Sequence, residues 1–258
     1  MSMIKELYNY REMTFSLIKR ELRGKYKASA LGFLWTLLIP LFQYVVYTVV
    51  FSVFMKSNIE KYYIFLIVGL FPWNFFSSSI TTGASCVVYQ ENLIKKIYFP
   101  RLVLPIAYVT SAFINMLISF VVVFAVLIFS GHGLSAAALC YLPLIMLIEY
   151  IMSLGVCMLV SALTVYFRDL EYILGILMLA WIYFTPVFYQ LDIVPKQCEV
   201  IFNINPMTSV ILAYQQILYD KRIPQMDNLM TAVLFGVVML VVGYLVFNKL
   251  QRKFVEEL

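Results

Sequence analysis

The chain has 258 residues, of which 63% are hydrophobic and only 13% are charged, and its formal net charge is +5. Soluble domains carry about a quarter charged residues, so this composition excludes an ordinary soluble domain and indicates an integral membrane protein. Apolar runs such as "FINMLISFVVVFAVLIF" lack polar alternation, which excludes a β-barrel and predicts an all-α fold. The positive charge reflects topology and membrane-lipid contact, and we expect no nucleic-acid partner.

Residues 1–30 predict a cytoplasmic amphipathic helix rather than a membrane span. Phe15, Ile18, Leu22 and Tyr26 recur at helical spacing, while basic residues occupy the other faces. Such a helix lies in the headgroup region of the inner leaflet. The alternative is a basic flank that only sets the topology.

Six apolar segments have the length and composition of membrane-spanning helices, which need about 20 residues each. They cover residues 33–55, 62–83, 103–129, 138–165, 172–189 and 229–248, and the fifth is close to the minimum length. An even number of spans returns both termini to one side of the membrane. If that side is the cytoplasm, it receives 14 of the 19 basic residues, as the positive-inside rule requires.

The loop between the second and third spans contains a short stripe of Leu93, Ile94 and Ile97, flanked by Lys95 and Lys96. We expect a cytoplasmic helix there that Pro100 ends. Its mixed apolar and basic character suits docking into a groove of a partner protein, so the segment from Leu93 to Tyr98 is a candidate coupling helix. A connecting loop with snorkelling lysines is the alternative.

Glu149 is the one acidic or basic residue expected at membrane depth. A carboxylate there is costly, so it is either an ion relay or gate contact, or a glutamate held by hydrogen bonds from neighbouring Ser, Thr or Tyr groups. Proton relays use chains of such residues. The isolated Glu149 therefore favours the second interpretation.

Arg168, Asp169 and Glu171 form a cluster of charged residues between the fourth and fifth spans, where the topology predicts a tight cytoplasmic hairpin. We expect Arg168 and Glu171 to contact the N-terminal helix and to hold a gate shut at rest. The simpler interpretation makes Arg168 a topology marker and Asp169 a cap of the following helix.

Residues 190–228 are expected to form an external re-entrant or interfacial pair of helices, broken at Asn205-Pro206. Residues 229–258 then supply the last span and a cytoplasmic tail, and residues 1–258 form one domain. Aromatic residues occur within the spans as well as at their ends. They are candidates to border a path for sugars, although helix packing is the default role for most of them; the leading positions are Trp35, Phe42, Trp181 and Phe184.

The sequence shows no enzymatic motif. There is no phosphate-binding loop of the G-x-x-x-x-G-K-[ST] type, no G-x-S-x-G elbow and no cluster with metal-ligand spacing. The single His132 lies in a predicted external turn. We therefore expect no cofactor and no metal in this chain.

Several fragments, taken in order, resemble the membrane subunits of type-2 ABC exporters, in the branch that exports lipid-linked polysaccharides (O-antigen, capsule and teichoic acid). The resemblance extends over nearly the whole chain. Two positions depart from the family pattern, because Gln190 stands where proline is frequent and Gln215 where arginine is common. The fragments are "LGFLW" with Pro40-Leu41, "GLFPWNFFSSSI", "LIKKIYFPRLVLP", "YFRDLEYIL", "TPVFY" and "NPMT".

The resemblance implies a bacterial inner-membrane exporter built from two copies of this chain and two copies of a separate ATPase, which binds ATP and Mg²⁺. Closure of the ATPase would push the coupling and amphipathic helices and open a path for an undecaprenyl-diphosphate-linked glycan. The alternatives are a wall teichoic acid exporter, a type-2 permease for drugs or lipids, a proton-coupled carrier, or a membrane-embedded glycan transferase.

Overall fold

The computed structural model describes residues 5, 8–24, 34–54, 58–197 and 199–258, and every regular element in these residues is helical, as expected. In chain order the α-helices are α2 (Arg11–Gly24), α3 (Trp35–Val49), α4 (Tyr62–Ala84), α5 (Glu91–Lys96), α6 (Val103–Phe129), α7 (Ala136–Leu139), α8 (Leu142–Tyr166), α9 (Leu170–Trp181), α10 (Glu199–Ile204), α11 (Pro206–Leu218), α12 (Met226–Leu250) and α13 (Phe254–Glu257). Shorter 3₁₀ or π turns are η2 (Val50–Phe54), η3 (Val88–Gln90), η4 (Ile182–Phe184), η5 (Leu191–Ile193) and η6 (Gln251–Lys253).

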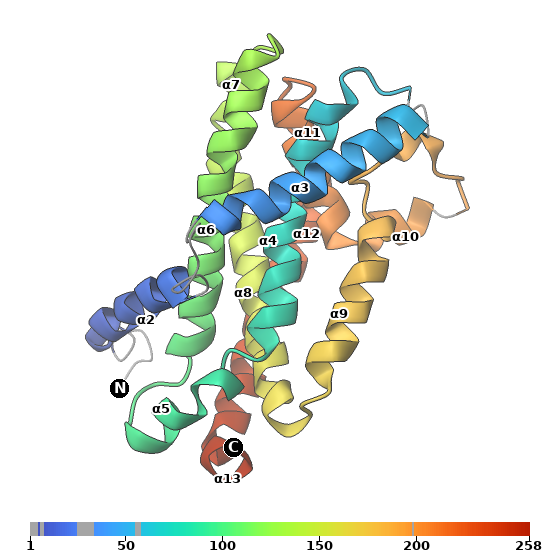
Figure 1. The fold of residues 1–258 in the computed structure, drawn as a ribbon. Helices are drawn as coiled ribbons and strands as arrows, with labels where there is room; N and C mark the ends of the chain where they lie inside the picture. Colours follow the sequence, from blue (N-terminus) through green and yellow to red (C-terminus); the bar gives the residue numbers. More distant parts are fainter. Residues whose placement is uncertain (1–4, 6–7, 25–33, 55–57, 198) are drawn as a thin grey trace.

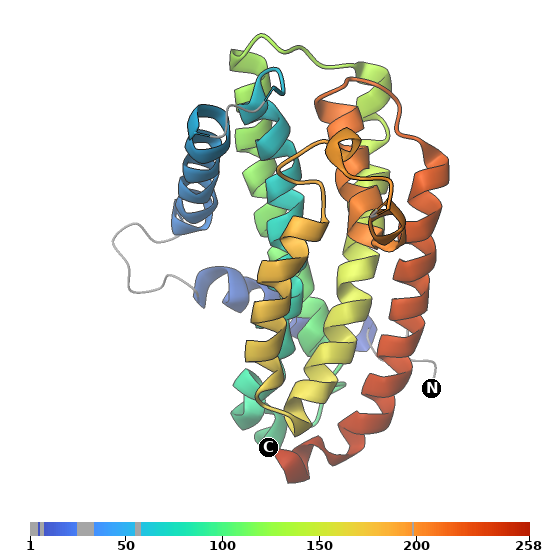
Figure 2. The same ribbon diagram turned by 90° about the vertical axis from the view of Figure 1, so that its right-hand side faces the viewer.

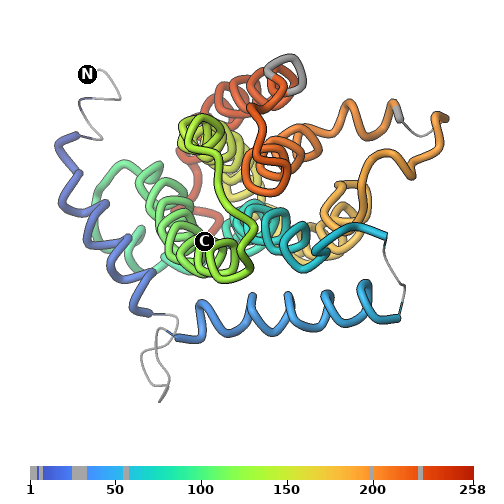
Figure 3. Tube along the Cα trace, turned by 90° about the horizontal axis from the view of Figure 1, so that it is seen from above, coloured from blue at the N-terminus to red at the C-terminus, as the bar shows by residue number. Residues whose placement is uncertain are grey.

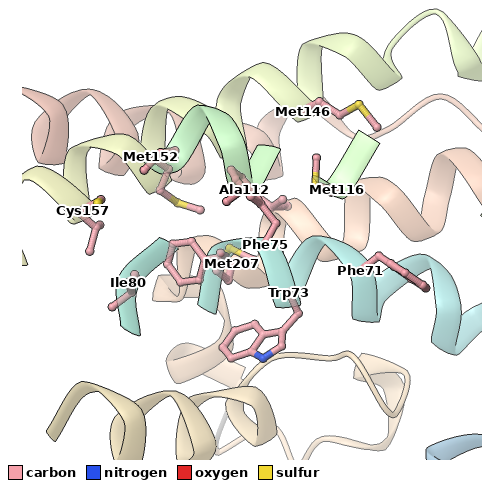
Figure 4. Packing of buried hydrophobic residues seen from close by; sticks show 14 of the residues in the cluster. Phe71, Trp73, Phe75, Ile80, Ala112, Met116, Met146, Met152, Cys157 and Met207 are labelled. Carbon is pink, nitrogen blue, oxygen red and sulfur yellow. The ribbon is translucent and has the colours of Figure 1, made fainter. Parts of the chain in front are cut away.

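The long helices α4, α6, α8 and α12 run side by side, with α9 next to α4 and α11 in the upper half of the bundle (Figures 1 and 2). Helix α4 lies at the centre, because 78% of its apolar span is buried. Its aromatic residues Phe71 and Phe75 lie near Met116 and Ala112 of α6, as Figure 4 shows. Interdigitated aromatic and thioether side chains of this kind fill irregular gaps between helices.

Helices α8 and α12 approach each other most closely where two glycines face each other. A Cβ atom on Gly155 would lie 2.5 Å from the backbone nitrogen of Leu240, and one on Gly243 would overlap the backbone of Gly155. Glycine at both positions lets the two backbones touch, which is a common way to pack helices in membranes.

Five described helices are long and apolar enough to cross a membrane, and they agree with five of the expected spans within a few residues at most boundaries. They are Trp35–Phe54, Tyr62–Ala84, Val103–Phe129, Ala136–Tyr166 and Leu229–Glu257. The remaining expected span, 172–189, is instead the shorter apolar helix Leu170–Phe184. It ends early because Thr185 precedes a proline and adopts an extended conformation. The six-span topology therefore stays a prediction.

Helix α3 crosses the outside of the bundle obliquely and packs mainly on α4 (Figures 1 and 3). None of its residues is buried in the single chain. The first and last residues of the expected first span, 33 and 55, lie outside the described residues. The sequence predicts the length of this helix well, but nothing in its apolar composition predicts this orientation.

The N-terminal helix α2 is amphipathic as expected, although its buried face is a different one. Leu17 is buried against the core and Met13 and Ile18 are partly buried, with α2 lying on α6. Phe15 is 68% exposed, because it lies about 200° around the helix from Leu17. Tyr26, which the expected stripe included, lies outside the described residues.

The external segment breaks at the expected place. Asn205 ends α10 and caps α11, since its side-chain oxygen accepts a hydrogen bond of 3.1 Å from the backbone of Met207. Pro206 then occupies the first helical position, where its missing N–H costs nothing. Almost all of α11 is buried against α4, α8 and α12, so this helix is part of the core of the bundle. Its re-entrant placement in a membrane stays a prediction.

Candidate functional site

A cleft of about 340 Å³ lies between α3 on one side and α4 and α6 on the other. We call it the α3 cleft. Trp35, Phe71 and Phe75 supply aromatic surface, yet most of the remaining lining is polar. The polar lining residues are Thr36, Gln43, Asn74, Ser77, Ser78, Thr81, Asn115 and Ser119. The cleft thus combines apolar surface with polar groups at membrane depth, which makes it a candidate site for water or for a solute with both hydroxyl groups and apolar faces.

Side-chain amides join and line the walls of the α3 cleft. Asn74 of α4 donates a hydrogen bond of 3.2 Å to the side-chain oxygen of Gln43 on α3. Across the cleft on α6, the side-chain oxygen of Asn115 is buried and makes no hydrogen bond within the described part of the chain. A buried acceptor without a partner is costly, so this amide is a candidate to bind a solute or water.

Three hydroxyl groups of the α3 cleft, on Ser78, Thr81 and Ser119, donate to their own helices. Ser78 donates to the carbonyl of Phe75 at 3.0 Å, and Ser119 donates to the carbonyl of Asn115 at 2.9 Å. A hydroxyl that donates in this way keeps its oxygen lone pairs as acceptors. The cleft therefore presents acceptors rather than charges, which suits ligands rich in O–H groups.

The four predicted aromatic positions do not gather in one place. Trp35 lines the α3 cleft, whereas Phe42 is 64% exposed on the outer side of α3. Trp181 packs edge to face on Phe76, and its indole N–H donates to the side chain of Asn205 at 3.1 Å. Phe184 is 49% exposed. In the single chain only Trp35 reaches a polar cavity, and a sugar-path role for the four aromatics stays a prediction.

The candidate coupling helix is α5, at the end of the bundle that also carries α13 (Figure 1). Its exposed surface differs from the predicted apolar stripe. Ile94 is buried within this chain and Leu93 is partly buried, so neither presents a docking surface. Ile97 and Tyr98 follow the helix in extended conformation and are 55% and 84% exposed. The docking role of residues 93–98 stays a prediction, now centred on Ile97 and Tyr98.

The two lysines of α5 are exposed and differ in their partners. Lys95 forms an ion pair of 2.7 Å with Glu91, and this hydrogen bond lowers the pKa of the Glu91 carboxyl. Lys96 is exposed next to Ile97. The exposed surface at the C-terminal end of α5 therefore combines a basic residue, Lys96, with the apolar side chains of Ile97 and Tyr98.

Glu171 ties α9 to the segment before α5. Its carboxylate accepts a hydrogen bond from the hydroxyl of Ser85 and another, of 3.2 Å, from the hydroxyl of Tyr89. Burial, and then the neighbouring Glu171 carboxylate, raises the pKa of Tyr89. Helix α2 packs mainly on α6. The contacts that the structure gives Glu171 are with Ser85 and Tyr89, and its expected contact with the N-terminal helix stays a prediction.

Arg168 and Asp169 are both exposed in the hairpin between α8 and α9. Asp169 precedes the first residue of α9, but its side chain makes no capping hydrogen bond. Its backbone is helical, whereas a capping side chain needs an extended backbone to reach the first turn. The gate role of Arg168 stays a prediction, and the capping role of Asp169 is not supported.

Glu149 is fully buried and accepts a hydrogen bond of 2.7 Å from the hydroxyl of Tyr214 on α11. Its second oxygen and the hydroxyl of Ser153, one turn further along α8, have no partner among the described residues. No other acidic or basic residue is buried in the described part of the chain. The arrangement matches a glutamate held by a tyrosine, and it provides no second carboxylate for a relay.

The C-terminal tail closes the α5 end of the bundle, which the sequence did not indicate. Phe254 is fully buried and packs edge to face on Phe247 and Tyr166. Arg101, just after the coupling segment, donates to the backbone carbonyl of Gln251 and lies over the ring of Phe254. The tail thus contacts the chain directly behind α5.

Sequence reasoning also missed the α3 cleft. The signal was present as polar residues at helical spacing inside apolar spans: Asn74, Ser78 and Thr81 on α4, and Asn115 and Ser119 on α6. Residues three or four positions apart share one face of a helix. The spacing of these residues does not predict the position of α3, which forms the other wall of the cleft.

Comparison with known proteins gives concordant matches. Residues 12–219 match the family model described as ABC-2 type transporter. The chain is 33% identical over 258 residues to the O-antigen export system permease protein RfbA of Myxococcus xanthus, covering 99% of both chains. It is 31% and 32% identical over 240 residues to two proteins of the same name from Klebsiella pneumoniae, covering 93% of this chain and 92% of each relative. A match of this extent shows that the chain belongs to the ABC-2 type transporter family.

Proposed function

We propose that this chain is the membrane subunit of an ATP-driven exporter of a lipid-linked polysaccharide of the cell surface. The observation that carries the proposal is the similarity, over almost the full length, to three permeases named for O-antigen export. The α3 cleft is compatible with it, because amides and hydroxyl acceptors beside aromatic surface suit a sugar, which has both O–H groups and C–H faces.

The exporter contains two copies of this chain and two copies of a separate ATPase, which supplies the ATP and Mg²⁺ site. The absence of a phosphate-binding loop from this sequence supports that division of labour. The α5 end faces the cytoplasm of a bacterial inner membrane, and both termini lie on that side. The exposed pair Ile97 and Tyr98, beside Lys96, docks into the ATPase.

Force from the ATPase reaches the spans through α5 and through the residues on either side of it, which have three connections to the bundle. The helix continues backward into α4, the central helix of the bundle. Glu171 connects the same segment to α9 through Ser85 and Tyr89. Arg101 connects it to the tail of α12. A displacement of α5 therefore moves several spans together and opens the path for an undecaprenyl-diphosphate-linked glycan.

The test is complementation of a bacterial strain that lacks its polysaccharide exporter, using this chain with its co-expressed ATPase. We expect surface polysaccharide to be restored, and ATP hydrolysis by the purified complex to rise with undecaprenyl-diphosphate-linked glycan. If ATP hydrolysis rose only with lipid-linked teichoic acid, the chain would be a teichoic acid exporter. If it rose only with drugs or lipids, the chain would be a permease for those compounds. Export that survives ATP depletion but needs Glu149 would establish a proton-coupled carrier, and a transferred glycan product would establish a transferase.

A further inference from the structure

A second polar cavity, of about 290 Å³, opens at the end of the bundle opposite α5. We call it the external pocket. It is formed by the start of α4, the residues after η4, the last two turns of α11 and the turn that leads to α12. Its size is at the lower limit of ligand pockets, which favours a single small ring over an extended chain.

Glutamines dominate the external pocket. Four of the chain's eight glutamines line it: Gln190, Gln215, Gln216 and Gln225. A primary amide offers both donors and an acceptor, and so does a hydroxyl group, so amides pair with polyhydroxylated ligands in either direction. Gln215 and Gln216 are buried and form the inner wall, whereas Gln190 and Gln225 are exposed at the rim.

Two of these amides are fixed by the fold and still have unused atoms. Gln215 donates a hydrogen bond of 2.8 Å to the carbonyl of Pro186, and Gln216 accepts one of 3.0 Å from the backbone of Gln225. Within the described residues, the remaining Oε1 of Gln215 and Nε2 of Gln216 make no hydrogen bond. The pocket therefore holds an acceptor and a donor in fixed positions, which reduces the entropy lost on binding.

The charges of the external pocket argue against an ionic ligand. The one arginine among its described lining residues, Arg222, forms an ion pair of 2.8 Å with Asp220, so the two charges largely cancel. Asp192 is exposed at the rim, where a carboxylate can accept hydrogen bonds from two adjacent hydroxyl groups. A neutral polyol ring matches this pattern best.

The walls of the external pocket include two aromatic rings. Phe65 and Tyr219 meet edge to face, with 5.5 Å between ring centroids. The hydroxyl of Tyr219 donates to the backbone of Glu60 at 2.6 Å, which fixes the ring. Aromatic surface beside amides provides a contact for the C–H face of a sugar while its hydroxyl groups bond to polar atoms.

We propose that the external pocket is a saccharide subsite that binds one neutral sugar residue of the exported glycan on the outer side of the membrane. This inference rests on the proposed function for the identity of the glycan, but the pocket's own chemistry defines the ligand class. Gln190 and Gln215, the two departures from the pattern of the resembled family, both lie in it. The subsite would hold the emerging chain and hinder its return.

The test uses the full-length permease with its ATPase in detergent and saturation-transfer NMR with methyl glycosides of hexoses, 6-deoxyhexoses and N-acetylhexosamines. We expect saturation transfer to at least one glycoside, and an affinity about two- to tenfold lower for each polar side chain removed in Gln190→Ala and Asp192→Ala. Both residues are exposed, so these variants fold normally. Gln197→Ala, in the same external segment but outside the pocket, is the matched control and should bind like the unmodified protein.

Absence of saturation transfer for every glycoside, or binding by Gln190→Ala and Asp192→Ala equal to that of the unmodified protein, would overturn the subsite. Complementation measures the proposed function separately. Restored polysaccharide without glycoside binding refutes the subsite alone, whereas pocket-dependent binding without restored polysaccharide refutes the export function alone.

Discussion

At the residue scale, the pair of Glu149 and Tyr214 is the feature with the clearest energetic consequence. Tyr214→Phe removes the donor and leaves a fully buried carboxyl group without that partner. We expect a loss of about 1–3 kcal/mol in stability, seen as a lower unfolding temperature of the purified protein. Glu149→Gln retains an acceptor oxygen for Tyr214, so it should unfold near the unmodified protein and still export. Loss of export in Glu149→Gln, with folding intact, would contradict the structural role.

The sequence indicates the cost of Glu149 but not its partner. An acid at membrane depth must be satisfied, and that much follows from composition. Tyr214 lies 65 positions away on α11, and only the burial of α11 inside the bundle brings the two together. Ile94 is similar: helical spacing places it on an apolar stripe, while its packing inside the chain, rather than on a partner, depends on tertiary contacts.

At the element scale, the crossing of α8 and α12 depends on Gly155. Gly155→Ala places a Cβ atom 2.5 Å from the backbone of Leu240, so the two helices must separate. Overpacking of this kind costs about 1–3 kcal/mol, and we expect a lower unfolding temperature and less inserted protein. Gly175→Ala on α9 is the matched control. Its Cβ meets nothing within 4 Å, so this change should be neutral or stabilising. Equal stability of the two variants would contradict the close crossing.

Element identity was largely predictable, whereas element placement was not. Hydropathy located five long helices, and Asn205-Pro206 marked the break between α10 and α11 through local cap chemistry. Helix α9 was predicted too long, because hydropathy continues past Thr185 while the proline at 186 ends the helix. The oblique course of α3 and the docking of Phe254 are set by contacts between distant segments, which periodicity does not encode.

At the scale of the whole molecule, assembly with the ATPase depends on the surface beside α5. Replacing both Ile97 by Asp and Tyr98 by Ala removes the exposed apolar groups there. We expect the variant to insert normally but to recover much less ATPase on affinity purification, and to lose export. Phe129→Ala is the matched control, since Phe129 is 90% exposed and ends α6 at the end of the bundle opposite α5 (Figure 1). Normal ATPase recovery with the double variant would place the docking surface elsewhere.

The lack of burial along α3 has a consequence for how this protein is made. Helix α3 leaves the ribosome before α4, its main neighbour, and none of the α3 residues is buried. The buried core contains no residue of α3, although Leu41, Tyr44 and Tyr47 of α3 pack against it. We therefore expect α3 to reach its place on the bundle only after α4 has been made. Until then, lipid or the insertion machinery surrounds the apolar side chains of α3.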